Sequence, residues 1–563
     1  MYSDKENLNI LTALLVKHGI RHAVVCPGSR NAPIAHNLHE AGIRCVPVTD
    51  ERSAGFQALG MAQATGLPVV VCVTSGTALL NLAPAVAEAF YQQQPLMVVS
   101  ADRPLRWIDQ LDGQTLPQEN ALKPFVRKAV ALPGIITCDE ERWHCNRLVN
   151  EALVEVGGRM ASLKSEVAGP VHINVPLEEP LFEFNTGSLP EQRVVMKIDK
   201  GVGKANYRFL AQLLSRAERP MVVVGQHEPM DEAKTLGAAL LRTKSVILAE
   251  RLAGCHDFAV PVDEALLLVK DDEAYQPDTI FYFGGTLVSK RLKHFLRKAG
   301  AKGTVVQVAP DGQLRDVTMH LDYLCVGTLQ GFIAYLGQEA SVSSESTAFH
   351  QRWEKVFAQV RQTTDDEQPP FSQLAVVKYF EQQLDDMEYP FHLHYANSTP
   401  VRLANSLVGQ HVWCNRGVNG IEGSLSTAVG FSIATDDRVF CVIGDLSFFY
   451  DQNALWNQNL RGNLRIILLN NGGGGIFHTL PGLEKSPVRD TLVTAGHHTS
   501  AQGICTQNDV GYLKADNMVD MKRGIVALLT ENRQRPMLLE VFTNPETDAK
   551  ALANHYKLLN DSP

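Results

Sequence analysis

The chain has 563 residues, a length that fits three or four domains with sizeable hydrophobic cores. Hydrophobic residues make up 45% and charged residues 20%, as in an ordinary globular protein, and no apolar run approaches the roughly 20 residues that span a bilayer. The formal net charge of −9 excludes a general attraction to nucleic acid or to an anionic membrane. We therefore expect neither a nucleic-acid partner nor membrane insertion.

The start of the chain and its cysteines bear on location. Residues 1–20 have the pattern of an amphipathic helix with acidic residues ahead of it, not that of a signal peptide. The ten cysteines are spread as single residues without a C-x-x-C pair, which favours reduced thiols. Both observations predict a cytoplasmic protein.

Short apolar runs alternate with helical patterns through the first third of the chain. The predicted strands of this part open the segments 22–30, 43–66, 67–90, 95–104 and 169–180. Because these strands are continuous apolar runs bounded by glycine and proline, they favour a parallel sheet that is buried on both faces. We predict a first α/β domain over residues 1–182.

Two further units repeat this alternation. Their predicted strands lie at 220–226, 245–250, 279–285 and 303–310, and then at 392–397, 438–445, 464–471 and 537–544. Polar sequence at 183–203 is typical of a linker, and the polar stretch 340–370 reads as a connection with one helix. The predicted fold class is α/β, with three doubly wound, mainly parallel-sheet domains, the second over 204–340 and the third over 371–563.

Polar residues follow two strands of the third unit. Asp445 comes after one strand, and Asn470, Asn471 and the glycines 472–475 come after the next. Parallel strands joined by a helix end at the same edge of a sheet, where ligands bind. A carboxylate, an amide oxygen and glycine-exposed carbonyls are hard ligands that suit Mg²⁺ together with phosphate oxygens. The structural alternative is that Asp445 caps a helix and the asparagines and glycines form a turn.

Glu51 lies where a strand of the first unit turns into a helix. As an acid in the first helical turn, it can simply complement the helix dipole. A role in a ligand site is equally open from this residue alone.

Several arginines also stand at predicted turns. One such arginine is most often part of a solvated or structural ion pair. Together they favour a pocket for substrates with several negative charges, because guanidinium groups bind carboxylates through two parallel hydrogen bonds. The set consists of Arg30, Arg103, Arg291, Arg402 and Arg416.

The Gly-Asp pair at 444–445, followed about 25 residues later by Asn-Asn at 470–471, resembles the signature of the thiamine-diphosphate-dependent decarboxylases and synthases. Members of this family have three α/β domains. Leu446 stands where many members have a glycine. The resemblance implies thiamine diphosphate as the cofactor and Mg²⁺ (or Mn²⁺) as the metal. The implied metal ligands are Asp445, the Asn471 side chain and the Gly473 carbonyl, and the implied cofactor contacts include Gly444, Leu446 and Ser447.

The resemblance also gives Glu51 a role. In the family, a glutamate after the second strand of the first domain hydrogen-bonds the aminopyrimidine ring of the cofactor and promotes the tautomer that removes the thiazolium proton. Glu51 and Asp445 lie far apart in the sequence, and in the family the two corresponding domains meet between subunits. A homodimer or homotetramer with the active site between subunits is therefore implied.

Further matches occur in the right order along nearly the whole chain, among them PGSR at 27–30, ADRP at 101–104 and GDLS at 444–447. They are similar to the branch of the family that joins two acids in menaquinone biosynthesis. The implied enzyme is a transferase that decarboxylates 2-oxoglutarate and adds the resulting succinyl carbanion equivalent to isochorismate in a 1,4 sense. The middle domain matches mainly at Lys290 and Arg291.

This likeness assigns further residues by position. The implied anion-binding residues are Ser29, Arg30, Arg103, Gln114, Arg291, Ser398, Arg402 and Arg416. Of these, we assign Ser29, Arg30, Gln114 and Arg402 to catalysis with Glu51, and the others to substrate binding. Ile421 matches the apolar residue that bends the cofactor, and Ile476 and Phe477 match residues that line the pocket beside it. Gly113 is a departure, since some members carry asparagine there.

Two alternatives are weighed against this interpretation. An acetolactate-synthase-like or other 2-oxoacid decarboxylase could bind FAD in its middle domain, but the segment 222–230 lacks G-x-G-x-x-G. A non-catalytic ligand-binding protein could share the fold, because fold does not fix function. The presence of Glu51, Asp445 and Asn471 argues against the second alternative.

Overall fold

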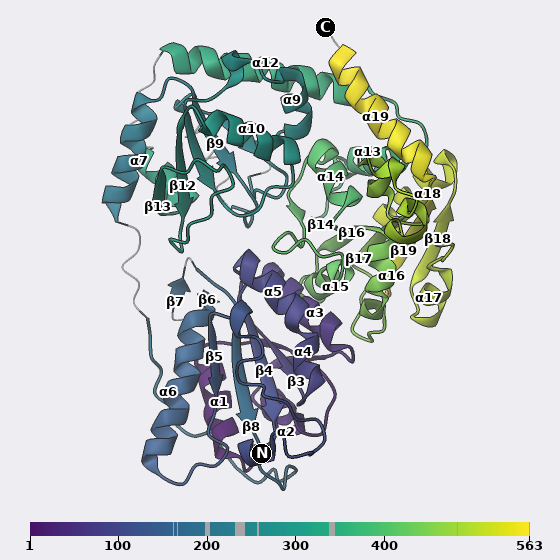
Figure 1. Ribbon diagram of the computed structural model, residues 1–563. Helices are drawn as coiled ribbons and strands as arrows, with labels where there is room; N and C mark the ends of the chain where they lie inside the picture. Colours follow the sequence, from purple (N-terminus) through teal and green to yellow (C-terminus); the bar gives the residue numbers. More distant parts are fainter. Residues whose placement is uncertain are drawn as a thin grey trace.

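The computed structural model describes residues 1–160, 163–165, 167–197, 203–230, 242–255, 258–336, 344–480 and 482–561. Within them the chain forms three parallel sheets, each covered by helices on both faces (Figure 1). This confirms the predicted fold class. The strands of each sheet fall within one of the three predicted ranges, and the domain boundaries themselves stay predictions.

The first sheet has the strand order β2-β1-β3-β4-β8-β5, with every pair parallel. Its strands are β1 (His22–Val25), β2 (Arg44–Pro47), β3 (Val69–Val73), β4 (Leu96–Asp102), β5 (Lys128–Ala131) and β8 (Val171–Pro176). The helices are α1 (Glu6–Lys17), α2 (Ala32–Glu40), α3 (Glu51–Thr65), α4 (Thr77–Asn81), α5 (Ala83–Gln92) and α6 (Asp139–Val156). A short hairpin joins β6 (Gly158–Met160) to β7 (Leu163–Ser165). The central strands β3 and β4 are buried along their whole length, as their continuous apolar sequence predicts.

The middle sheet has the order β10-β9-β11-β12-β13. Its strands are β9 (Pro220–Val224), β10 (Val246–Ala249), β11 (Thr279–Phe283), β12 (Thr304–Ala309) and β13 (Tyr323–Val326). The helices are α7 (Lys204–Arg216), α9 (Val262–Val269), α10 (Lys290–Gly300), α11 (Leu329–Leu336) and α12 (Ser344–Asp366). Helix α12 is the single helix predicted for the connection 340–370.

The third sheet has the order β15-β14-β16-β17-β19-β18. Its strands are β14 (Phe391–Tyr395), β15 (Val412–Trp413), β16 (Arg438–Gly444), β17 (Leu464–Asn470), β18 (Gly511–Ala515) and β19 (Met537–Phe542). The helices are α13 (Gln373–Leu384), α14 (Thr399–Leu407), α15 (Ser424–Ala434), α16 (Asp445–Tyr450), α17 (Gln502–Gln507), α18 (Met518–Thr530) and α19 (Pro545–Asp561). Short helical turns follow at Gln452–Leu455, Gly475–Thr479, Leu483–Lys485 and Arg489–Val493.

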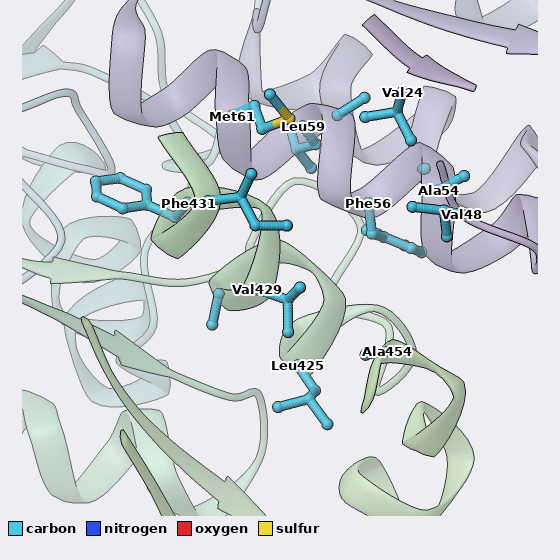
Figure 2. Packing of buried hydrophobic residues seen from close by; sticks show 14 of the residues in the cluster. Val24, Val48, Ala54, Phe56, Leu59, Met61, Leu425, Val429, Phe431 and Ala454 are labelled. Carbon is cyan, nitrogen blue, oxygen red and sulfur yellow. The ribbon is translucent and has the colours of Figure 1, made fainter. Parts of the chain in front are cut away.

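The first and third domains share one hydrophobic core. Helix α3 lies along α15, and Phe56 and Leu59 of α3 belong to the same buried cluster as Leu425 and Val429 of α15 (Figure 2). This packing joins the helix that begins at Glu51 to the helix that follows Ile421. We call the predicted residues around Glu51 and those around Asp445 the two half-sites. Their relative positions within one chain are therefore fixed by one helix pair.

No helix among the described residues is long and apolar enough to cross a bilayer.

Candidate active site

Asp445 lies at the carboxyl edge of the third sheet, directly under a glycine-rich loop. Its strand β16 pairs with β17, so the residues after both strands meet, as predicted. The Oδ2 atom of Asp445 accepts hydrogen bonds from the backbone N–H groups of Asn471 (3.1 Å), Gly472 (2.8 Å) and Gly473 (2.9 Å). Its Oδ1 atom accepts one from the N–H of Leu446 at 2.7 Å. The loop thus wraps around a single buried carboxylate.

Two glycines allow this loop geometry. Gly472 has φ +79°, a conformation that favours glycine. At Gly473, a Cβ would lie 2.8 Å from the carbonyl oxygen of Thr494. The glycine run is therefore required by backbone conformation and by close packing, in addition to any ligand.

The electrostatics of Asp445 result from burial and its neighbours. Burial raises the pKa of its carboxyl group, while the backbone hydrogen bonds and the nearby His497 oppose that rise. The Nε2 atom of His497 lies 3.4 Å from Oδ2 of Asp445. A divalent cation at this position would favour the ionised carboxylate.

The donor atoms around Asp445 fit a magnesium site. The side-chain amide of Asn471 donates to Oδ2 of Asp548 at 3.1 Å, which orients that amide, and the Gly473 carbonyl lies in the loop that covers Asp445. One carboxylate, one amide oxygen and one carbonyl are the hard oxygen donors that Mg²⁺ uses when phosphates and water complete its shell. Consistently, the described part of the chain holds no cluster of three or more His, Cys, Asp or Glu side chains that could bind a metal without such help.

Apolar side chains border the Asp445 loop. Ser447 donates a hydrogen bond from Oγ to the carbonyl of Ile421, which fixes Ile421 beside α16. Ile421 is 39% exposed, so its side chain is accessible to a ligand or a partner. Ile476 and Phe477 lie in the helical turn that follows the glycines.

The predicted residues of the first domain gather at the carboxyl edge of the first sheet. Ser29 and Arg30 follow β1, Glu51 follows β2 and Arg103 follows β4. Gln114 packs against the turn after β3, where a Cβ on Gly76 would lie 3.3 Å from its Cα.

Glu51 is the first residue of α3, and the helix is capped by its neighbour. The side chain of Asp50 accepts a hydrogen bond from the N–H of Ser53 at 3.2 Å, so Glu51 is not needed as the cap. Its Oε2 atom accepts a hydrogen bond from Nδ2 of Asn81 at 3.2 Å. Burial, followed by the charge of Glu51, raises the pKa of the Cys26 thiol.

Arg30 and Arg103 both have partners within the first domain. Arg30 is buried and donates to the Leu177 carbonyl (2.9 Å) and to Glu179 (2.9 Å). Arg103 donates to the Gly113 carbonyl at 2.8 Å and pairs with Asp112 at 3.0 Å. A substrate anion would therefore join or displace an existing acidic partner. At Gly113 itself, a Cβ would meet no atom within 4 Å, so a larger side chain would have room there.

Arg291 and Arg402, from two domains, approach Asp263, the second residue of α9, and Arg416 approaches Arg402. Arg291 of α10 donates from Nη1 to the Asp263 carbonyl at 3.3 Å. Burial lowers the pKa of Arg402. The positive charge of Arg416 lowers this pKa further, while the negative charge of Asp263 opposes both effects. Arg416 is buried, donates from Nη1 to Asn397 Oδ1 at 3.1 Å, and has no hydrogen-bond partner on Nε among the described residues. Such a cluster of poorly solvated cations is suited to a ligand with several carboxylates.

Ser398 stands at the start of α14, one turn before Arg402. Its φ of +76° is rare for a residue that is not glycine, and such conformations concentrate at functional sites.

The structure does not join the two groups of predicted residues within one chain. Among the described residues, no hydrogen bond or ion pair joins Glu51 itself to Asp445. The chain contacts between the domains lie beside them instead: Arg52 donates to the Tyr450 carbonyl at 2.7 Å, and Asn453 donates to Asp50 at 2.7 Å.

Sequence reasoning missed residues that hold the site in place. Buried Asn397 donates to the carbonyls of Asn415 (2.6 Å) and Gly420 (2.7 Å), so it fixes the loop that carries Arg416. Buried Glu88 of α5 accepts hydrogen bonds from the N–H groups that follow Arg416, at 2.6 and 2.7 Å. The sequence did carry a signal for each: Asn397 is a polar residue at a strand end, and Glu88 is the single carboxylate in an apolar helix.

A cavity of about 660 Å³ lies elsewhere, at the carboxyl ends of the middle sheet. Its lining includes Gln226, Lys293, Arg315 and Trp413, and none of the predicted site residues. The residues around Asp445 therefore do not line this cavity.

Comparisons with known proteins bear on the family. Residues 8–123 match the model described as "Thiamine pyrophosphate enzyme, N-terminal TPP binding domain". Proteins named 2-succinyl-5-enolpyruvyl-6-hydroxy-3-cyclohexene-1-carboxylate synthase are similar over the whole length. The one from Bacteroides thetaiotaomicron is 42% identical over 99% of this chain and 100% of its own. Those from Bacteroides fragilis and Desulfotalea psychrophila are 42% and 35% identical, over 100% and 96% of this chain and 100% and 99% of their own. The chain therefore belongs to the family of 2-succinyl-5-enolpyruvyl-6-hydroxy-3-cyclohexene-1-carboxylate synthases, among the thiamine-pyrophosphate enzymes.

Proposed function

We propose that the chain decarboxylates 2-oxoglutarate and adds the resulting succinyl unit to isochorismate, as a thiamine-diphosphate-dependent transferase of menaquinone biosynthesis. The products are 2-succinyl-5-enolpyruvyl-6-hydroxy-3-cyclohexene-1-carboxylate and CO₂. The observation that carries this proposal is the likeness to synthases of that name at 42% identity over the full length. It favours this reaction over an acetolactate-synthase-like activity and over a non-catalytic role.

The Asp445 loop is the proposed anchor of the cofactor. Asp445, Asn471 and Gly473 would hold Mg²⁺ (or Mn²⁺), and the residues at the start of α16, Leu446 and Ser447, would lie beside the diphosphate. When bound, thiamine diphosphate supplies a thiazolium that stabilises the carbanion left by decarboxylation. The support from the chain is the set of hard oxygen donors collected around one buried carboxylate.

Glu51 would act on the aminopyrimidine end of the cofactor. Asp50 already caps α3, so the Glu51 carboxylate remains available for a ligand while Asn81 orients it. Ile421 would support the bent cofactor, and Ile476 and Phe477 would shield the reacting atoms from water.

The arginines would bind the carboxylates of the two substrates. Arg291 and Arg402 approach Asp263, and Arg416 approaches Arg402 and has no hydrogen-bond partner on Nε among the described residues, which supports a site for a multiply anionic molecule. Ser398, Ser29, Arg30, Arg103 and Gln114 would complete the pocket from the two sheet edges.

The assembly proposed is a homodimer or homotetramer with the active site between subunits. Two features support it: among the described residues no hydrogen bond or ion pair joins Glu51 to Asp445, and large apolar side chains are exposed in segments that follow Arg103 and precede α15. These side chains are Leu105, Trp107 and Leu111 in the segment after Arg103, and Val418 and Ile421 in the segment before α15. A subunit interface would bury them. The expected location is the cytoplasm, in keeping with ten cysteines that form no disulfide within the described residues.

The reaction is tested by incubating the protein with 2-oxoglutarate, isochorismate, thiamine diphosphate and Mg²⁺, and by mass analysis of the products. The expected product is isochorismate plus the succinyl unit, with release of CO₂, and it should disappear when either acid or the cofactor is omitted. Turnover of pyruvate in place of 2-oxoglutarate, or no carboligation at all, would contradict the proposal.

The shared active site has its own test. Glu51→Gln and Asp445→Ala should each be inactive, because each removes one half of every site. Hybrid dimers of the two variants would contain one intact site, so co-expression should restore activity, to about a quarter of wild type when subunits pair at random. A site built within one chain would give no restoration.

A further inference from the structure

The C-terminal helix α19 reaches out of the third domain and packs on the middle domain (Figure 1). Its contact centres on His555, whose Nδ1 lies 2.7 Å from Oε2 of Glu367 and whose Nε2 lies 3.4 Å from Oε1 of Glu264. All three side chains are almost completely buried. The helix is thus fastened to α9, which contains Glu264, and to the segment that follows α12.

The next residue, Tyr556, touches an arginine of the proposed acceptor pocket. The guanidinium of Arg291 lies over the Tyr556 ring, 4.6 Å from its centroid. The same guanidinium donates to the carbonyl of Asp263, the residue before Glu264. His555 therefore contacts Glu264 of α9 directly. The next residue of α19, Tyr556, contacts Arg291, which in turn contacts Asp263 of α9.

The position of Arg291 at the start of a helix explains why contact with Tyr556 matters for this side chain. It lies in the first turn of α10, which contains no acidic residue and also carries Lys290. Cations at a helix N-terminus are opposed by the helix dipole. An arginine side chain also has many rotamers to lose when it binds a ligand. An aromatic face that stacks on the guanidinium restricts those rotamers before the ligand arrives.

We infer that Tyr556 is a positioning residue for Arg291, and that the C-terminal helix is thereby part of the pocket for the carboxylates of the acceptor. The inference rests on the proposed function, because it takes Arg291 as a ligand of the acceptor. The ring of Tyr556 holds the guanidinium plane, the Asp263 carbonyl holds Nη1, and the His555 contacts keep α19 at the distance that stacking requires.

The test compares Tyr556→Leu with Tyr556→Phe. The leucine variant loses the aromatic face, so its KM for isochorismate should rise roughly 2- to 30-fold, the range expected for one cation–π contact. Decarboxylation of 2-oxoglutarate without acceptor should stay within about twofold of wild type, because the substitution lies well along α19 from Asp548, the residue of this helix that contacts Asn471 of the Asp445 loop. The phenylalanine variant keeps the ring but loses the hydroxyl, which interacts with Arg291, so its KM should rise less than that of the leucine variant.

Two further measurements separate positioning from general damage. Tyr389 stacks under Arg438 at 4.7 Å at the opposite edge of the third sheet, so Tyr389→Leu is a matched control that should leave the KM for isochorismate unchanged. In an Arg291→Met background, Tyr556→Leu should have no further effect on that KM, because the residue it positions is gone.

The outcomes are distinct. An equal rise in KM in both backgrounds, or a phenylalanine variant as impaired as the leucine variant, would overturn the inference alone. Absence of acceptor-dependent product from the wild-type protein would overturn the proposed function, and this inference with it.

Discussion

Gly60 of α3 lies so close to Thr427 of α15 that a Cβ on Gly60 would stand 1.9 Å from the Thr427 carbonyl oxygen. The relation is reciprocal, since a Cβ on Gly430 would stand 1.9 Å from the carbonyl of Gln57. The two helix backbones therefore touch without side chains between them. Because α3 begins at Glu51 and α15 follows Ile421, this contact sets the spacing of the two half-sites in each chain.

Gly60→Ala should therefore destabilise the protein, although alanine normally stabilises a helix by about 1 kcal/mol relative to glycine. The added methyl group must push the helices apart, at a cost of roughly 1–3 kcal/mol or more. Thermal unfolding should show a lower Tm, and activity should fall because both half-sites move. Gly503→Ala, on the exposed helix α17 with nothing within 4 Å of the new Cβ, should be neutral or slightly stabilising. Equal behaviour of the two variants would contradict close helix contact.

The sequence predicted the central strands of the sheets and the edge strands β2 and β10, but it missed the other edge strands. The unpredicted strands β5, β13, β15 and β18 are each the outermost strand of a sheet. Central strands such as β17 are buried on both faces and appear as long apolar runs, whereas β13 exposes three of its four residues. An edge strand needs little burial, so its pattern resembles a loop.

The part of the site that lies at one edge of a single sheet was predictable from the sequence. Asp445 and Asn471 follow neighbouring parallel strands, so their meeting follows from topology. The convergence of Arg291 with Arg402 could not be derived in this way, because it depends on how the middle domain docks on the third through α9. Asn397 and Glu88 act through backbone N–H and carbonyl groups, whose positions no sequence pattern shows.

Asp445→Ala should weaken the binding of thiamine diphosphate, together with its dependence on Mg²⁺. The variant loses one metal ligand and also the acceptor for three loop N–H groups, so the loss should be roughly tenfold or more. Calorimetric titration with the cofactor, with Mg²⁺ and with excess chelator, measures both effects. Asp516→Ala, an exposed change in the same domain, should bind as wild type does. An Asp445→Ala variant whose affinity in Mg²⁺ equals that of wild type, and falls as much in chelator, would show that the metal is held elsewhere.

Glu51→Gln should keep cofactor binding and lose most turnover. The amide oxygen can still accept the hydrogen bond from Asn81, but the group can no longer share a proton with the aminopyrimidine ring. Loss of general acid–base assistance should cost about two to four decades in rate. The readout is exchange of the thiazolium proton with deuterium in the bound cofactor, with Glu140→Gln as an exposed control. Exchange at the wild-type rate would rule out the assigned role.

Arg402→Ala and Arg103→Ala should differ in which half-reaction they impair. Loss of one bidentate contact to a desolvated carboxylate costs roughly 2–5 kcal/mol, or about one and a half to four decades in kcat/KM. Arg402 follows Ser398 by one turn at the edge of the third sheet, so both decarboxylation and carboligation should slow.

Arg103 is assigned to isochorismate, so its alanine variant should still release succinic semialdehyde from 2-oxoglutarate while carboligation collapses. Arg106→Ala in the same segment removes an exposed ion pair with Glu178 and should have little effect. Stopped-flow kinetics separate the two steps, and equal loss of both in Arg103→Ala would refute the assignment.

The contact of His555 with Glu264 and Glu367 should make the docking of α19 depend on pH. Burial disfavours the imidazolium ion, but the hydrogen bonds and charges of the two carboxylates outweigh it and raise the pKa of His555 to about 9. Asp263 and Arg251 also lie near Glu264. The carboxylate of Asp263 disfavours the ionised form of Glu264, and the guanidinium of Arg251 favours it. Since the folded pKa lies above the unfolded value of 6.5, the stabilisation is fully present below pH 6.5 and is lost as the pH rises through 9. The pKa of Glu264 is lowered despite its burial, because His555 and Ser406 favour its ionised form, so acid below its ordinary pKa of 4.5 removes the same stabilisation.

His555→Gln should consequently lower the stability most near pH 6 and least above pH 9. Removing the cation leaves two buried carboxylates without a counter-charge, at a cost of roughly 3–5 kcal/mol near pH 6. The difference in Tm between wild type and variant should shrink steadily from pH 6.5 to 9.5, since the wild type itself loses the ion pair over that range. His144→Gln, an exposed change on α6, should give a Tm difference near zero at every pH. A Tm difference for His555→Gln that stays constant across this range would mean that His555 is neutral in the folded protein, and that α19 is held by packing alone.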